Sequence, residues 1–138
     1  LKYNTAPFVI GCGEGMGNYV DGNIQVEYNE ISNPQMFDYA LDVSHNTITG
    51  DLQLFRNTAD YGDIRVYANM IIGNLQCEYN HPMPRGMDNT VYGNAEGQCY
   101  GFDGEMMGDG SDDDYTHNEP RRVKTSPNAR EVMGLSLR

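Results

Sequence analysis

Apolar and polar side chains alternate with a period of two along three stretches of this chain. Residues 20–27, 48–55 and 71–78 show the alternation, and their apolar positions fall in register from one stretch to the next. Successive side chains of a β-strand point to opposite faces, so alternation at this period indicates strands rather than helices. The pattern therefore predicts three similar strands, each with one apolar face.

Each of these strands begins within a copy of one motif, Asn-x-[Val/Ile]-x-Gly, which occurs four times in the chain. The copies place like residues in columns, for example Ile24 with Leu52 and Leu75. Such columns arise when every repeat is one coil of a solenoid, stacked about 4.8 Å from the last. We therefore predict an all-β fold, a short right-handed parallel β-helix of about four or five coils with an irregular C-terminal tail. The right hand follows from the general preference of parallel crossovers, and a β-sandwich or meander is the alternative.

Columns of amide side chains accompany the apolar columns. The first column opens the motif and holds Asn18, Asn46, Asn69 and Asn89. The second follows the strands and holds Asn29, Asn57 and Asn80. Asparagine tolerates the left-handed backbone of a sharp corner, so we expect these residues to adopt it. Stacked amides also hydrogen-bond along a column, and an outward ladder of the same kind is expected from Gln25, Gln53 and Gln76.

A longer run of residues resembles a known class of proteins. Residues 73–80 read Gly-Asn-Leu-Gln-Cys-Glu-Tyr-Asn, a proline-containing loop follows, and residues 88–99 read Asp-Asn-Thr-Val-Tyr-Gly-Asn-Ala-Glu-Gly-Gln-Cys. Over residues 40–102 the chain resembles the C-terminal coils of secreted bacterial β-helix proteins of the pectate-lyase-like class. The resemblance implies the fold and a secreted setting, and it implies no particular reaction. Such proteins tend to stop near this cysteine, whereas this chain continues through residues 103–138.

The three cysteines divide into a pair and a single residue. Cys77 and Cys99 occupy nearly equivalent positions one coil apart, so we predict a disulfide between them. A secreted setting permits that bond, and the closed loop is worth about 3 kcal/mol. Cys12 is left over, and the sequence leaves open whether it is buried, free or joined to another chain.

The chain divides into three predicted parts. Residues 1–17 form an N-terminal segment that leads into the coils or caps them, residues 18–102 form the β-helix, and residues 103–138 form an acidic linker and a basic tail. A chain of 138 residues fits a single domain. Its start at leucine, without a signal-like run, predicts a mature secreted protein whose targeting segment has been removed. No apolar run is long enough for a membrane span, so none is expected.

Charge is distributed unevenly along the chain. The formal net charge is −11, with acidic residues concentrated in the body and a weakly basic tail. An acidic body excludes nucleic-acid binding by the main surface. The basic tail residues are Arg121, Arg122, Lys124 and Arg130. Two interpretations of the tail stay open. In one it is disordered, and in the other it docks on the acidic side or the open end of a neighbouring subunit and so builds a homo-oligomer or filament.

Outward carboxylates and basic residues are the first candidates for chemistry, because polysaccharide cleavage uses such groups on one outer face. The alternation points outward the side chains of Glu27, Asp42, Arg56, Asp63, Arg65 and Glu78. No pair of acids repeats with a supporting arginine or lysine. We therefore interpret these residues as solvated strand positions and predict no catalytic residue.

A calcium site is the second candidate. Residues 103–114 combine glycine with carboxylates, which supply the turns and hard oxygen ligands that calcium requires. The candidate ligands are Asp109, Asp112 and Asp114. Their spacing differs from that of an EF-hand loop, and a flexible acidic linker explains the composition equally well. No other cofactor is predicted.

Two hypotheses about function follow. In the first, the protein is a secreted, non-catalytic structural protein that self-associates through its open ends and tail into an oligomer or extracellular filament. In the alternative, it is a small carbohydrate-binding or polysaccharide-degrading, lyase-like β-helix protein with polysaccharide as its partner. The ten tyrosines suit stacking on sugars, and they suit assembly surfaces as well.

Overall fold

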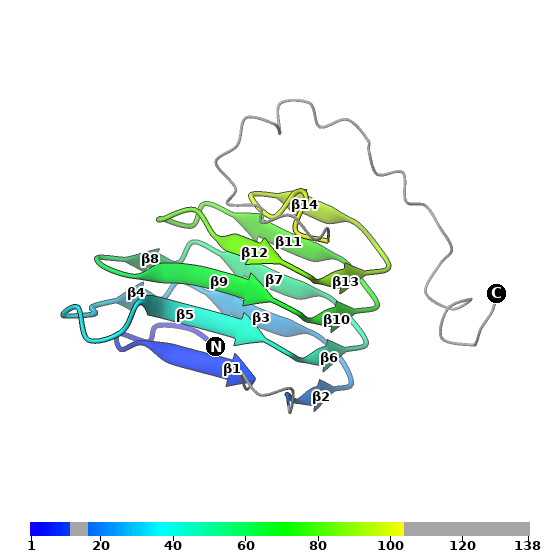
Figure 1. The fold of residues 1–138 in the computed structure, drawn as a ribbon, viewed down its shortest axis with the longest axis horizontal. Helices are drawn as coiled ribbons and strands as arrows, with labels where there is room; N and C mark the ends of the chain where they lie inside the picture. Colours follow the sequence, from blue (N-terminus) through cyan, green and yellow to red (C-terminus); the bar gives the residue numbers. More distant parts are fainter. Residues whose placement is uncertain (12–16, 104–138) are drawn as a thin grey trace.

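The computed structural model describes residues 1–11 and 17–103. These ranges contain strands and no helix, and every pair of neighbouring strands is parallel. Figure 1 shows the strands stacked in successive coils, so the predicted parallel β-helix is confirmed. Within these ranges there is no helix with the length and apolarity of a membrane span.

Three four-stranded sheets form the sides of the coils. The first contains, in spatial order, β1 (Phe8–Gly11), β5 (Tyr39–Ser44), β9 (Asp63–Tyr67) and β12 (Arg85–Met87). The second contains β2 (Tyr19–Val20), β6 (Thr47–Ile48), β10 (Met70–Ile71) and β13 (Thr90–Val91). The third contains β3 (Ile24–Glu27), β7 (Leu52–Phe55), β11 (Leu75–Glu78) and β14 (Ala95–Gly97). A short pair, β4 (Glu30–Ile31) and β8 (Thr58–Ala59), closes one end of the cross-section.

The apolar columns lie in the register that the repeats predict. Leu52 pairs with Ile24 on one side and with Leu75 on the other, and both leucines are fully buried. Burial of one apolar stripe per strand is the main stabilising term, about 25 cal/mol for each Å² removed from water. The core is therefore a narrow stack of aliphatic residues enclosed by the three sheets.

The last coil is closed by its own chain. Cys99 and Phe102 are fully buried, and Cys99 forms the predicted disulfide with Cys77 in β11, with a Cα–Cα distance of 5.3 Å. Phe102 packs on Gly86, where a Cβ would approach the phenyl ring to 2.5 Å. The disulfide is consistent with an oxidising location, and Cys12 lies outside the described residues.

The first residues belong to the stack. Lys2 forms a parallel bridge with Glu27, and the Leu1 carbonyl accepts a hydrogen bond of 2.9 Å from the Glu27 amide. Further along, β1 pairs with β5 over its whole length. Residues 1–11, which the sequence assigned to a leading segment or cap, thus extend two of the sheets by one coil.

The asparagine columns form hydrogen-bonded ladders, as predicted. At the second corner, Asn29 Nδ2 donates to Asn57 Oδ1 at 2.7 Å, and Asn57 Nδ2 donates to Asn80 Oδ1 at 2.8 Å. Asn4 precedes Asn29 in this ladder, and Gln98 follows Asn80. The ladder is therefore longer at both ends than the repeats indicated.

The first corner carries an amide ladder of the same kind, and so does the outer face of the third sheet. Asn18, Asn46, Asn69 and Asn89 are joined by Nδ2-to-Oδ1 hydrogen bonds of 3.0 Å at each step. The outward glutamine ladder also forms, from Gln25 through Gln53 to Gln76. It ends at Glu96, whose carboxylate accepts from Gln76 at 3.1 Å.

One expectation about the corners is wrong. The left-handed backbone belongs to the residue before each ladder asparagine other than Asn18, for example Tyr28 with φ 56° and His45 with φ 63°. The reason is the ladder itself, because each asparagine aligns both its backbone amide and its side-chain amide with the next coil. Asn57 does so by donating both groups to Asn80 Oδ1, at 3.0 and 2.8 Å. The bend is therefore taken up one residue earlier.

Candidate functional site

The outside of the second corner carries a continuous row of large side chains. We call it the Tyr–Arg column, and it consists of Tyr3, Tyr28, Arg56 and Tyr79. These are the left-handed residues that directly precede the asparagine ladder, with φ values between 56° and 60°. Successive members therefore come from successive coils, after strands β3, β7 and β11.

Adjacent members of the column are in contact. The rings of Tyr3 and Tyr28 stack with centroids 6.0 Å apart and planes 24° apart. The Arg56 guanidinium lies 4.7 Å from the Tyr79 ring centre and 6.0 Å from that of Tyr28. Lys2 Nζ approaches the Tyr28 ring to 5.9 Å. Cation–π contacts of this kind are worth about 0.5–1 kcal/mol each at an exposed site.

The column is exposed although its backbone is unfavourable. Tyr3 is 73% exposed and Tyr79 is 67% exposed. A left-handed conformation costs a bulky residue about 1 kcal/mol relative to the usual conformation, whereas glycine or asparagine would fit with less strain. The ladder imposes this backbone, so the informative feature is that large, exposed side chains occupy positions where smaller residues would fit with less strain. The column is therefore the first part of the candidate site.

A groove lies beside the column. It has a volume of about 320 Å³, and we call it the first groove. Its lining residues are Tyr3, Asn4, Thr5, Tyr28, Glu30, Arg56 and Thr58. Two aromatic rings, three neutral polar side chains, one carboxylate and one guanidinium thus converge on one concave surface. Such a surface can stack on an apolar face of a ligand and hydrogen-bond to its rim.

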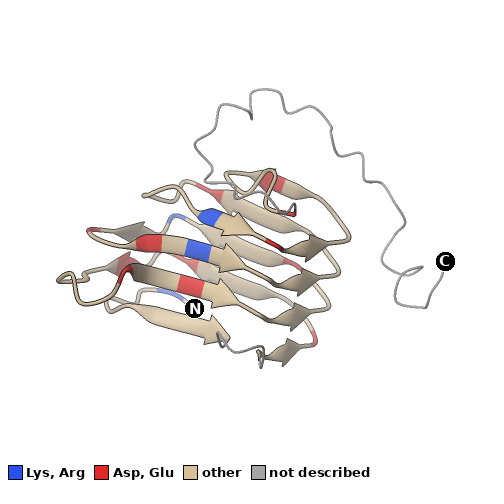
Figure 2. Ribbon diagram, in the orientation of Figure 1, with Lys and Arg blue, Asp and Glu red and all other residues tan. Residues whose placement is uncertain are grey.

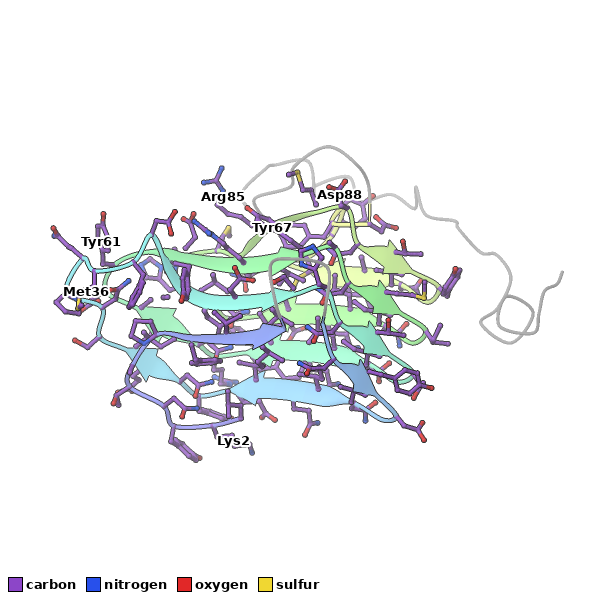
Figure 3. The ribbon with its side chains drawn as sticks, turned by 60° about the horizontal axis from the view of Figure 1, so that its bottom comes forward. Lys2, Met36, Tyr61, Tyr67, Arg85 and Asp88 are labelled. Atoms are coloured by element: carbon purple, nitrogen blue, oxygen red, sulfur yellow. A yellow bond between two sulfur atoms is a disulfide. The ribbon has the colours of Figure 1, made fainter. Side chains whose placement is uncertain are left out.

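A second groove lies beyond the short strands β4 and β8. Its volume is about 430 Å³, and we call it the second groove. Its lining residues are Asp38, Ala59, Asp60, Tyr61, Gly62, Asp63, His81 and Pro82. Tyr61 is 44% exposed, and Figure 3 places its ring at the outer end of the molecule, near Met36. This groove is richer in carboxylates than the first groove.

Ion pairs neutralise part of the second groove and the face next to it. Arg65 in β9 lies 3.0 Å from the Asp38 carboxylate and 3.7 Å from that of Asp63. Arg85 in β12 also approaches Asp63, at 3.7 Å. Figure 2 shows acidic and basic residues on neighbouring strands of the first sheet. The hydrogen bond from Arg65 and its positive charge lower the pKa of Asp38.

The predicted outward residues therefore separate into two groups. Asp63 and Arg65 belong to the network of the first sheet, while Glu27 lies at the second corner, 3.8 Å from Lys2. Asp42 lies beside Arg65 in the register of β5 and β9. Arg56 belongs to the Tyr–Arg column. Sequence reasoning treated all of them as solvated strand positions and missed this division.

The column could have been found from the repeats. Tyr28, Arg56 and Tyr79 each precede a ladder asparagine in the sequence, so their alignment was available as a signal. Tyr61 and Asp38 lie in loops of unequal length and carry no such signal. Their meeting in one groove depends on how the loops fold over the coils.

Metal binding has limited support in the described part of the chain. Residues 1–11 and 17–103 contain no group of three or more His, Cys, Asp or Glu side chains arranged to hold a metal ion. The calcium candidates Asp109, Asp112 and Asp114 lie outside these ranges. The predicted assembly residues of the tail, Arg121, Arg122, Lys124 and Arg130, lie outside them as well.

Comparisons with protein-family models, curated proteins and solved structures found no match to this chain.

Proposed function

We propose that this protein is a non-catalytic β-helix that binds polysaccharide through the Tyr–Arg column and the first groove. The observation that carries the proposal is the row of exposed rings held at strained backbone positions along one corner. Tyrosine rings stack on the apolar faces of sugar rings and keep a hydroxyl for hydrogen bonding. The groove supplies further donors and acceptors from Asn4, Thr58 and Glu30.

The chemistry of the groove supports binding more than cleavage. Arg56 is placed against two aromatic rings, and Glu27 is placed near Lys2. Cleavage of a glycosidic bond requires two carboxyl groups that face each other across the bond. In the register of the third sheet, Phe55 separates Glu27 from Glu78. These residues therefore fit the recognition of a sugar surface better than proton transfer.

The test is depletion of the full chain from solution by insoluble cellulose, chitin and starch. We expect at least one of these polymers to bind the wild type. We expect it to bind the Tyr79→Asn variant about tenfold more weakly, which corresponds to about 1.4 kcal/mol. Asparagine suits the left-handed backbone, so this change removes the ring without straining the corner. The matched control is Tyr19→Asn, because Tyr19 is 70% exposed on β2, away from the column.

Two results would contradict the proposal. One is equal loss of binding in the Tyr79→Asn and Tyr19→Asn variants, which would indicate non-specific adsorption. The other is release of unsaturated or reducing sugars from these polymers or from pectate, because that product would make the protein an enzyme.

Self-association is a second proposal, and one feature of the first coil favours it. In the described part of the chain, β1 and β2 each have a hydrogen-bonded neighbour on one side only. Neither strand carries a charged residue, as Figure 2 shows, so nothing on them opposes pairing with another strand edge. Light scattering tests this proposal with Val9→Lys, which puts a charge on the edge. An unchanged mass for this variant and for a chain lacking residues 115–138 would reject it.

A further inference from the structure

The two grooves border the same short strand, β8. Thr58 in β8 lines the first groove, and its neighbour Ala59 lines the second. Glu30 in β4, which pairs with Thr58, lines the first groove. His81 forms a parallel bridge with Thr58 and lines the second groove. One narrow strip of strand therefore separates two concave surfaces.

The segment of β8 between the grooves carries only small side chains. Thr58 and Ala59 are small, and Thr58 is exposed. Aromatic rings lie on both sides of it, with Tyr28 in the first groove and Tyr61 in the second. Figure 3 shows Tyr61 at the outer end of the molecule and Lys2 on its lower edge. A ligand longer than one sugar unit could therefore contact both sides at once.

We infer that the two grooves form one extended site for a neutral oligosaccharide chain, which crosses β4 and β8 and rests on Tyr61 at its far end. This inference rests on the proposed function and adds the length and charge of the ligand. Each groove alone is at the lower end of the size range for ligand sites, about 300–1,000 Å³. Together they offer the repeated aromatic platforms that a chain of rings requires.

The charge of the lining residues disfavours binding of an acidic polysaccharide. The Asp60 carboxylate in the second groove accepts hydrogen bonds from the backbone amide of Asn33 at 2.9 Å and from the Ser32 hydroxyl at 3.4 Å, and both donors are neutral. The first groove is lined by one carboxylate, Glu30, and one guanidinium, Arg56, so the excess of carboxylate lies in the second groove. A surface lined with carboxylates repels polyanions, whereas the same oxygens accept hydrogen bonds from sugar hydroxyls. The site therefore fits a neutral chain.

The experiment is calorimetric titration of the full chain with short and long members of two series, cellobiose with cellohexaose and chitobiose with chitohexaose. We expect the longer member of one series to bind at least tenfold more tightly than the shorter. Tyr61→Ala is expected to weaken binding of the longer ligand about tenfold and to leave the shorter ligand unchanged. Tyr79→Asn is expected to weaken both, and Tyr19→Asn neither.

The outcomes separate this inference from the proposed function. If Tyr79→Asn weakens both ligands while Tyr61→Ala changes neither, the site is confined to the Tyr–Arg column and the first groove, and the inference fails alone. If polygalacturonate binds more tightly than the neutral ligands, the charge argument fails. If none of these ligands nor an insoluble polysaccharide binds the wild type, the proposed function and the inference both fail. Circular dichroism confirms that each variant is folded.

Discussion

The two asparagine corners of the coil have the same interior and different exteriors. At the first corner, Asn46 and Asn69 are joined by an amide hydrogen bond of 3.0 Å. At the second, Asn57 and Asn80 are joined by one of 2.8 Å. In each case the residue before the asparagine is left-handed, with φ values of 56° at Ala68 and 59° at Arg56. The ladder therefore sets the backbone whatever side chain precedes it.

The side chains on the outside of the two corners differ. The first corner has His45, Ala68 and Asp88 at the left-handed positions, and the second has Tyr28, Arg56 and Tyr79. Alanine at one of these positions is enough for the fold. An aromatic and cationic row is therefore more than folding requires, which is why the function is assigned to the second corner.

The largest expected effect tests the shared interior. Asn57 is fully buried, donates to Asn80 and to the Val26 carbonyl, and accepts from Asn29. Asn57→Leu leaves these buried partners without hydrogen bonds, so we expect a loss of about 4 kcal/mol in the free energy of unfolding. Urea denaturation measures it.

The matched change at the first corner is Asn69→Leu, since Asn69 is 1% exposed and bonded in the same way. We expect a loss of similar size, about 4 kcal/mol. A loss below about 1 kcal/mol at one corner only would mean that the ladders are not equivalent.

The next effect concerns the last coil. Replacing Cys77 and Cys99 together by serine removes the disulfide, which joins β11 to the closing turn. We expect the free energy of unfolding to fall by about 3 kcal/mol, because the unfolded chain regains loop entropy. Urea denaturation of the double variant measures the loss. Cellohexaose affinity is expected to stay within twofold of the wild type, since neither cysteine lines a groove; a larger loss would tie the site to the last coil.

A smaller effect separates strain from function. Ala68→Asn and Arg56→Asn both place a residue that tolerates the left-handed backbone, and we expect Ala68→Asn to raise the free energy of unfolding by about 1 kcal/mol. For Arg56→Asn we expect a smaller rise in the free energy of unfolding, because this change also removes two cation–π contacts of about 0.5–1 kcal/mol each. Arg56→Asn alone is expected to weaken saccharide binding. Equal binding by both variants would remove Arg56 from the site.

The smallest effect is a pH dependence at the second groove. The hydrogen bond from Arg65 and its charge lower the pKa of Asp38 from its ordinary value. The ion pair therefore stabilises the fold above the ordinary pKa, and this contribution is lost as the pH falls through the lowered pKa. Asp38 is exposed, so the expected change is small. Thermal denaturation below about pH 4 should depend less on pH in Asp38→Asn than in the wild type; parallel curves would show that the pair contributes nothing.

Local alternation was enough to predict the strands and the apolar columns. The pairing of Ile24, Leu52 and Leu75 and the disulfide of Cys77 with Cys99 could both be read from aligned repeats. The corner conformation could not. It depends on how Asn57 orients both of its amides toward the next coil, a relation between coils that residue preferences alone do not express.

The amino-acid sequence by itself determined that the chain stacks, because a period of two and a recurring motif are properties of neighbouring residues. Only the tertiary structure decided what the exterior offers. Arg65 reaches Asp38 because β5 and β9 pair side by side, with a register shift between Tyr39 and Leu41. The second groove forms where loops of unequal length lie over similar coils, and the length of a loop does not fix its path.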